Sequence, residues 1–209
     1  MARFVPSPNC GARRNDLTPS LIVIHYTAME NAQAALERLC APEAEVSAHY
    51  LIDLGGDVIQ MVEEAERAWH AGAGEWHGHD DINSRSIGIE LDNRGNHPFP
   101  EPQMTALETL MRGIMGRWDI PASGVIGHSD MAPGRKFDPG PHFDWARLER
   151  QGLAARPQSF ETGDHEAFVA AAQAAGFTAP AEIKALLLST RLRRAPWRKG
   201  ALQAADFKL

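Results

Sequence analysis

Cysteine and long apolar runs are what this sequence has least of. Cys10 and Cys40 are the only cysteines among 209 residues, too few for the disulfide framework of a small secreted protein, so we expect two free thiols. No stretch reaches the roughly 18 consecutive apolar residues of a membrane-spanning helix, and the first residues lack the apolar core of a signal peptide. These absences favour a cytoplasmic protein that does not enter a membrane.

An excess of positive charge is also missing. The formal net charge is −6 at pH 7, which gives no indication of a nucleic-acid partner. The charge is unevenly spread, because residues 181–209 hold seven lysines and arginines against two acidic residues. No feature of the sequence indicates the oligomeric state.

Short apolar runs alternate with amphipathic segments along most of the chain. A continuous β-branched run predicts a buried strand at residues 21–24, and alternation predicts another at 86–91, with Ile87, Ile89 and Leu91 on one face. Gly55 and Gly56 lie between two further predicted strands, 48–52 and 57–62, and this pattern predicts a hairpin. The predicted elements also include a short buried strand at 124–126 and helices 31–40, 102–118, 145–153, 164–176 and 180–194.

This order predicts an α/β fold with a mixed central β-sheet flanked by helices. We expect that domain to span residues 1–155, with a small helical C-terminal appendage in residues 156–209. Residues 1–20 are predicted to wrap the surface. The segment 69–86 is predicted to be a loop, and its tryptophans and histidines favour a functional one.

Two histidines and one aspartate are candidates for a metal site. His25 and His128 each follow a predicted buried strand, and Asp138 lies in a proline-bounded loop. Two imidazoles and one carboxylate, with a fourth position left to water, form a typical catalytic zinc site. The residues alone therefore suggest a zinc hydrolase, although their spacing is not a motif.

Two more residues fit the needs of such a hydrolase. Glu90 lies within a predicted buried strand, where a carboxylate needs a partner or a role, and it is our candidate general base. Gly88, two residues earlier, leaves room beside it for a substrate cleft. Lys136 precedes Asp138 by two residues and could stabilise the oxyanion of a tetrahedral intermediate.

Five segments in order carry a family resemblance. They are IHYTA (24–28), AWHAG (68–72), SIGIELDN (86–93), GHSD (127–130) and RKFDPGP (135–141). Together they resemble the zinc-dependent N-acetylmuramoyl-L-alanine amidases of the AmpD/AmiD type, whose fold is shared with the peptidoglycan-recognition proteins. The resemblance covers about residues 5–153, and the later residues faintly resemble the helical peptidoglycan-binding appendage of AmiD-type members.

The resemblance implies one zinc ion per chain on His25, His128 and Asp138, with Glu90 and Lys136 in catalysis. It implies a muropeptide or peptidoglycan fragment as substrate, cleaved between N-acetylmuramic acid, in its 1,6-anhydro form, and L-alanine, in cytoplasmic peptidoglycan recycling. The implied substrate contacts are His70, Asn93 and Arg85. The remaining histidines are interpreted as structural or exposed: His49, His77, His79, His97, His142 and His165.

Three alternatives remain at this point. The chain could be a muropeptide-binding module without catalysis, or an amidase that acts on intact peptidoglycan held by the basic tail around Trp197. The third is a non-haem iron site, since His128 and Asp130 have the His-x-carboxylate spacing of a facial triad and His165 could complete it.

Overall fold

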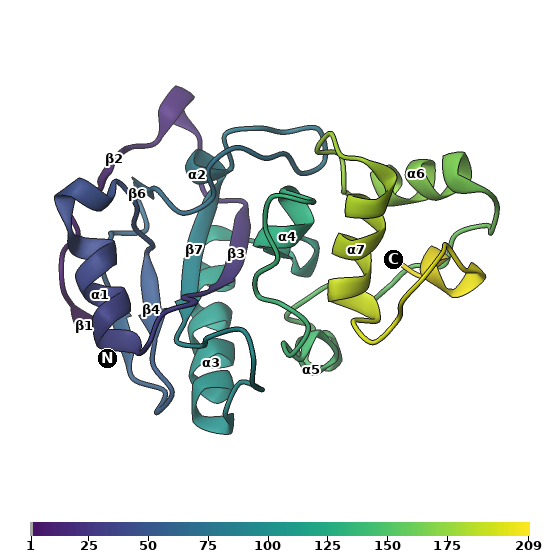
Figure 1. The fold of residues 1–209 in the computed structure, drawn as a ribbon. Helices are drawn as coiled ribbons and strands as arrows, with labels where there is room; N and C mark the ends of the chain where they lie inside the picture. The colour runs from purple at the N-terminus through teal and green to yellow at the C-terminus, as the bar shows by residue number, and fades with distance from the viewer. Residues whose placement is uncertain (1) are drawn as a thin grey trace.

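A six-stranded sheet forms the centre of the structure, a computed structural model that describes residues 2–209 (Figure 1). The strand order is β1-β5-β4-β7-β3-β8. β3 lies between β7 and β8 and runs parallel to both, while β5 is antiparallel to β4, so the sheet is mixed as predicted. The strands are β1 (Arg3–Phe4), β3 (Leu21–Tyr26), β4 (Tyr50–Ile52), β5 (Val58–Gln60), β7 (Ser86–Leu91) and β8 (Val125–Gly127).

β3 is buried on both faces, which explains its continuous β-branched sequence. Ile22 and Ile24 belong to a hydrophobic cluster with α3 (Glu101–Trp118) and α5 (Trp145–Arg150). Val23 points the other way, into a cluster that includes Ile126 and Met131. The predicted alternation of β7 is confirmed, because Ile87, Ile89 and Leu91 all lie in the first cluster.

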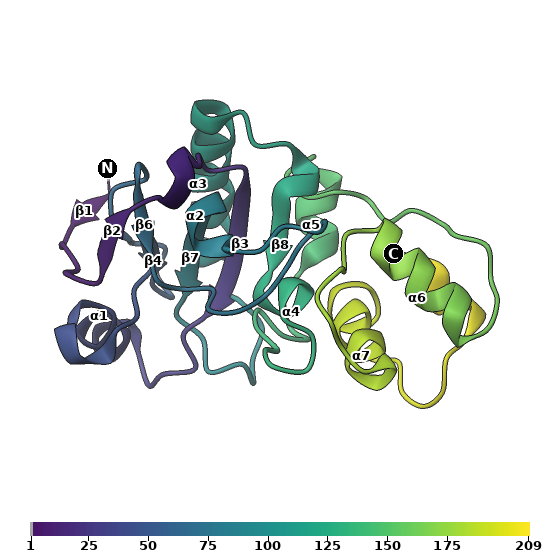
Figure 2. The same ribbon diagram turned by 90° about the horizontal axis from the view of Figure 1, so that it is seen from above.

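Helices cover both faces of the sheet. Figure 2 shows α3 and α5 on one side and α1 and α4 on the other, with α6 and α7 beyond the β8 edge. The helices other than α3 and α5 are α1 (Ala32–Cys40), α2 (Ile82–Arg85), α4 (His128–Met131), α6 (His165–Ala174) and α7 (Ile183–Arg194), and the 3-10 turns are Arg14–Asp16, Pro42–Ala44, Ala122–Gly124 and Ala204–Phe207. Among residues 2–209, no helix is both long and apolar enough to cross a membrane.

Helix starts were predictable from single residues. The side chain of Asn31 accepts a hydrogen bond from the backbone N–H of Ala34 at 2.9 Å, which caps α1. Asp144 caps α5 through the N–H of Arg147 at 2.9 Å, and Asp164 caps α6. In each case a short polar side chain satisfies an N–H group that the first helical turn leaves free.

Five short strands and helices were not predicted: β1, β2 (Cys10–Ala12), β6 (Glu66–Ala68), α2 and α4. The first twenty residues do not only wrap the surface, because they contribute β1 and also β2, which pairs with β6 in a separate two-stranded sheet. The predicted loop 69–86 ends in the one-turn helix α2. Elements of two to four residues are too short to show a periodicity, so pairing in the folded chain decides them.

Residues 156–209 pack against the β8 edge of the sheet. Phe168 of α6 and Leu186 of α7 share one buried cluster with Ile126 and Met131. Within this region the buried guanidinium of Arg191 donates to both carboxylate oxygens of Asp206, at 3.0 and 2.6 Å. The division of the chain near residue 155 into two domains stays a prediction.

The Arg191–Asp206 pair predicts a pH-dependent contribution to stability. Burial alone would raise the pKa of Asp206, but hydrogen bonds from Arg191 and Arg198 lower it from 3.8 to about 2. A carboxylate with a depressed pKa stabilises the folded state above its unfolded pKa, and this stability disappears as the pH falls through the folded pKa. The shift corresponds to roughly 2 kcal/mol. The advantage of the wild type over Asp206→Asn should therefore be largest at pH 7 and shrink between about pH 4 and pH 2.

Urea denaturation at a series of pH values measures this difference. Asp164→Asn is a suitable control, because asparagine caps a helix as well as aspartate does. It should change the free energy of unfolding by less than about 0.5 kcal/mol at pH 7. A wild-type advantage over Asp206→Asn that stays constant from pH 7 to pH 3 would contradict the assignment.

Candidate metal centre and active site

The parallel strands bring three of the predicted site residues to one edge of the sheet. His25 and Glu90 are register partners in β3 and β7, near the carboxyl ends of both strands. Ile24 pairs with Gly127, so His128, the next residue after β8, starts α4 at the same edge. Carboxyl ends of parallel strands are where α/β proteins commonly bind ligands.

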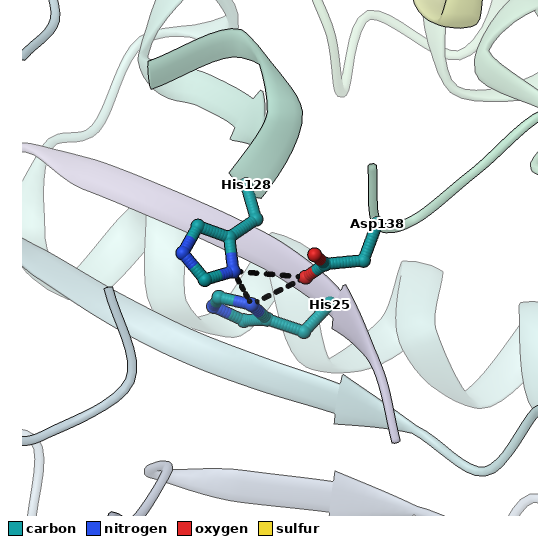
Figure 3. Close-up of side chains that lie close together, drawn as sticks. All are labelled: His25, His128 and Asp138. Atoms are coloured by element: carbon teal, nitrogen blue, oxygen red, sulfur yellow. Dashed lines mark hydrogen bonds and ion pairs between the residues drawn. The ribbon is translucent and has the colours of Figure 1, made fainter. Parts of the chain in front are cut away.

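Asp138 reaches this edge from the loop after α4. The backbone N–H of Ser129 donates to the carbonyl oxygen of Asp138 at 2.9 Å, which ties the loop to the first turn of α4. Figure 3 shows the carboxylate of Asp138 facing the rings of His25 and His128. All three residues are buried.

The ligand atoms of these three residues converge closely. Asp138 Oδ2 lies 2.8 Å from His25 Nδ1 and 3.0 Å from His128 Nδ1, and the two Nδ1 atoms are 2.9 Å apart. Among residues 2–209, these residues form the one group of His, Cys, Asp and Glu side chains that could hold a metal ion. Electron pairs directed at one point repel unless a cation or proton lies between them, so the donor set fits a metal ion.

A backbone carbonyl determines which nitrogen of His128 is free. Nε2 lies 2.8 Å from the carbonyl oxygen of Ala71. A carbonyl only accepts, so Nε2 carries the proton and the Nδ1 of neutral His128 presents a lone pair to Asp138 and His25. A carbonyl that accepts from the second ring nitrogen is typical of metal-binding histidines.

The protonation states also suit a metal site. Burial, reinforced by His128, lowers the pKa of His25 to about 4, which keeps its ring neutral at pH 7. Burial alone would raise the pKa of Asp138, but its close contacts with His128 and His25 hold it well below its usual range. Two neutral imidazoles and an ionised carboxylate are the forms that bind a metal.

His70 contacts His25 directly. Its Nδ1 lies 3.0 Å from His25 Nε2, and its Nε2 lies 3.1 Å from the hydroxyl of Ser86. The space beside Gly88 is therefore no part of a substrate cleft, because a Cβ atom at that position would lie 2.5 Å from the His70 ring. Glycine is needed here so that His70 can pack on β7 and orient His25.

Glu90 borders the cavity with one oxygen unpaired. Its Oε2 is buried and has no hydrogen-bond partner in the described part of the chain. Burial, together with the nearby Asp138 carboxylate, raises the pKa of Glu90 to about 8, against an opposing effect of Lys136. A carboxyl group with a pKa close to neutral pH is suited to accept and return a proton.

A cavity of about 400 Å³ opens over the three ligands. Lys136 and Glu90 both line it, as do the side chains of Trp69 and Phe137, the latter 47 % exposed. The cavity thus combines a candidate metal site, a carboxyl group, an ammonium group and exposed aromatic surface. That combination can bind a polar substrate and hydrolyse an amide.

The structure does not bring Asn93 and Arg85 to this cavity. Asn93 is buried, and its side chain is occupied by the backbone N–H of Gly95 and the carbonyl of His97. Arg85 is the last residue of α2, just before β7 and at the end of that strand remote from Glu90, and it donates to the carbonyl of Asp80. Both predictions came from the family resemblance, in which residues after the catalytic glutamate line the substrate groove.

The iron-site alternative fails on geometry. Asp130 is fully buried, and its Oδ2 accepts hydrogen bonds from the N–H of Gly127 at 2.8 Å and from Arg193 at 2.6 Å. Its carboxylate is thereby occupied and does not belong to the ligand group. His165 is exposed at the start of α6.

Sequence analysis missed the contribution of Arg135 and Ala71. Arg135 Nη2 donates to the carbonyl of Ala71 at 2.7 Å, the same carbonyl that accepts from His128. The position of Arg135 next to Lys136 was a usable signal for the arginine. No sequence signal marks a backbone carbonyl as the partner of a ligand.

Comparisons with known proteins agree with this geometry. The family profile described as N-acetylmuramoyl-L-alanine amidase matches residues 15–141. The amidase AmiD of Escherichia coli is 40 % identical over 155 residues, 66 % of this chain and 55 % of AmiD, so the match spans about half of that relative. The 1,6-anhydro-N-acetylmuramyl-L-alanine amidase AmpD of Escherichia coli is 36 % identical over 164 residues, 70 % of this chain and 90 % of AmpD.

Solved structures show the same fold. AmpDH3 from Pseudomonas aeruginosa, in complex with an anhydromuramic pentapeptide, superposes with a TM-score of 0.80 at 29 % identity, and the match covers 90 % of this chain and 88 % of AmpDH3. The mixed six-stranded sheet, the His-His-Asp group and the matched profile therefore lead to one conclusion: the chain belongs to the N-acetylmuramoyl-L-alanine amidase family.

Proposed function

We propose that this chain hydrolyses the amide bond between the lactyl group of 1,6-anhydro-N-acetylmuramic acid and the L-alanine of its stem peptide. The observation that carries the proposal is the convergence of His25, His128 and Asp138 below a cavity that Glu90 and Lys136 also line. The substrate class is supported by the name of AmpD and by the anhydromuramic pentapeptide bound to AmpDH3.

Zinc is the metal proposed for this site, one ion per chain. Two imidazoles and one carboxylate form a common ligand set of catalytic zinc, with one position open to water or substrate. Bound there, zinc would polarise the scissile carbonyl and lower the pKa of a water molecule towards ~7. The residues that hold it are His25 and His128 through Nδ1 and Asp138 through Oδ2.

Glu90 is proposed to move the protons of the reaction. Its buried Oε2 has no competing partner, so it can accept a proton from the attacking water and return it to the leaving nitrogen of L-alanine. Such assistance requires a pKa near the working pH, and burial shifts the pKa of Glu90 in that direction.

Lys136 is proposed to stabilise the oxyanion that develops when the amide carbonyl is attacked. Its ammonium group lines the same cavity and approaches from the loop that carries Asp138. A positive charge fixed before the reaction stabilises the transition state more than the substrate, because negative charge on the oxygen grows only during attack.

We propose cytoplasmic peptidoglycan recycling as the setting of the reaction, because the name of AmpD and the ligand of AmpDH3 both support a small soluble fragment as substrate. Trp69 and Phe137 offer apolar surface for the sugar or the peptide. His70 contributes by orienting His25. The side chains of Asn93 and Arg85 are hydrogen-bonded away from the cavity, and their roles as substrate contacts stay predictions. Residues 156–209 are proposed to support the catalytic part of the chain.

The first prediction from the proposed function concerns the metal. Purified protein should contain about one zinc ion per chain by elemental analysis, and chelation should abolish activity that added zinc restores. His128→Ala should lose both zinc and turnover, because the variant lacks one of three protein ligands. His142→Ala, at a histidine outside the ligand group, is the control and should keep both. Full zinc content and full turnover in His128→Ala would exclude this site.

The second prediction separates Glu90 from the metal ligands. Glu90→Gln should retain zinc and the wild-type melting temperature, while kcat falls by about 10²–10⁴-fold, the usual value of general acid–base assistance. Single-turnover kinetics and elemental analysis measure the two properties. Loss of zinc from this variant would instead identify Glu90 as a ligand.

The third prediction concerns the substrate. Mass spectrometry of a digest of anhydro-muropeptide should show a free peptide that begins with L-alanine, and kcat/KM should be higher for this substrate than for intact peptidoglycan. Binding without cleavage by zinc-loaded protein would support the non-catalytic module. A preference for the polymer would support the wall-degrading alternative.

A further inference from the structure

Arg193 belongs to the C-terminal region, but its side chain enters the catalytic part of the chain. It lies on the last turn of α7 and is only 7 % exposed. Its Nη1 donates to Asp130 Oδ2 at 2.6 Å, and its Nη2 donates to the carbonyl of Val125 at 3.2 Å. The guanidinium carbon lies 4.0 Å from the centroid of the Trp145 ring, so the planar group is also stacked.

These contacts hold both ends of β8. Val125 is the first residue of that strand, and Gly127 is the last. Asp130 Oδ2, which pairs with Arg193, also accepts the backbone N–H of Gly127 at 2.8 Å. Arg193 and Asp130 therefore fix the point where β8 ends and α4 begins, and the first residue of α4 is His128.

The same junction also positions Asp138, the metal-ligand residue in the loop after α4. The N–H of Ser129 donates to the carbonyl of Asp138 at 2.9 Å, so a shift of α4 would also move Asp138. Two of the three ligand side chains thus depend on the position of one short helix. A movement of that helix would therefore displace both His128 Nδ1 and Asp138 Oδ2.

We propose that Arg193 is a positioning residue for the metal centre: through Asp130 and Val125 it fixes the start of α4 and thereby the direction of His128. This inference rests on the proposed zinc site. It makes the C-terminal region part of the catalytic architecture, beyond any role in holding substrate.

The charge of Arg193 is required as well as its shape. Asp130 is fully buried, and its Oδ1 has no hydrogen-bond partner in the described part of the chain. Without Arg193 the carboxylate would stay buried and uncompensated, which the fold can relieve by moving α4 or by letting water in. Either movement would loosen the ligand geometry.

The C-terminal region supports the neighbouring loop in the same way. The N–H of His77 donates to the carbonyl of Gly176 at 3.0 Å, and the N–H of Gly78 donates to Thr178 Oγ1 at 2.7 Å. That loop begins after Ala71, whose carbonyl accepts from His128 Nε2. Residues beyond 155 therefore contact both the segment that follows Ala71 and the junction of β8 with α4.

Zinc affinity of the intact chain, measured by competition with a chelator, tests the inference. Arg193→Met should bind zinc about 10–100-fold more weakly than wild type, the usual cost of losing a residue that orients a ligand. Arg191→Met is the matched control, because Arg191 is also buried on α7 and also paired with a buried aspartate, but its partner Asp206 lies within the C-terminal region. It should lower the melting temperature and leave zinc affinity within about threefold of wild type.

A double-mutant cycle adds a readout that general destabilisation would not give. Asp130→Asn should also weaken zinc binding, and the combined variant should lose less affinity than the product of the single losses, because both changes break one contact. Arg193→Lys keeps the charge but not the two-pronged geometry, and it should fall between wild type and Arg193→Met.

Three outcomes would overturn the inference. The Arg193→Met variant could fold and bind zinc with wild-type affinity, or Arg191→Met and Arg193→Met could lose equal zinc affinity. The third is a double-mutant cycle in which the Arg193 and Asp130 changes affect zinc affinity independently. If Arg193→Met does not fold, wild-type zinc affinity in Arg193→Lys and Asp130→Asn would overturn it. A wild-type chain that binds no zinc would overturn the proposed function as well. If the wild type binds zinc tightly and the Arg193 and Asp130 variants bind it equally well, only this inference is wrong and the proposed function stands.

Discussion

Parallel pairing of β3 with β7 and β8 is the constraint on which the rest of this structure depends. It aligns the carboxyl ends of three strands, so that His25, Glu90 and His128 meet at one edge although 103 residues separate the two histidines. The strands can be placed this accurately because most of their other side chains are buried between two helical layers. The core thus determines the distances at the site.

Backbone atoms and small residues help to orient the side chains of the metal-ligand residues. The Ala71 carbonyl selects the tautomer of His128, and Gly88 leaves room for His70 beside His25. These partners cost little to bury, because each polar group is hydrogen-bonded. Glu90 Oε2 is the exception in the cavity, and an unpaired buried oxygen at a raised pKa is typical of a group retained for catalysis.

The C-terminal region exposes fewer positive charges than the arginines in its sequence suggest. Arg191 and Arg193 are buried, and each is neutralised by a buried aspartate, one within the region and one in α4. Trp197, in contrast, is 74 % exposed, next to Arg198. The region therefore combines an inner face that completes the catalytic part of the chain with an outer face that remains accessible to solvent.

The sequence by itself determined the fold class, the main strands and helices, and three helix caps, because these depend on local periodicity and on single polar residues. It also indicated His25, His128 and Asp138, through ordered motifs shared with a family. Other contacts became visible only in the folded chain. His70 contacts the metal-ligand residue His25, and Arg193 reaches Asp130. The side chains of Asn93 and Arg85 form hydrogen bonds away from the cavity. The contacts of His70 and Arg193 join segments far apart in the chain, whereas those of Asn93 and Arg85 are hydrogen bonds to residues nearby in the sequence. Neither kind of contact leaves a periodic pattern in the sequence.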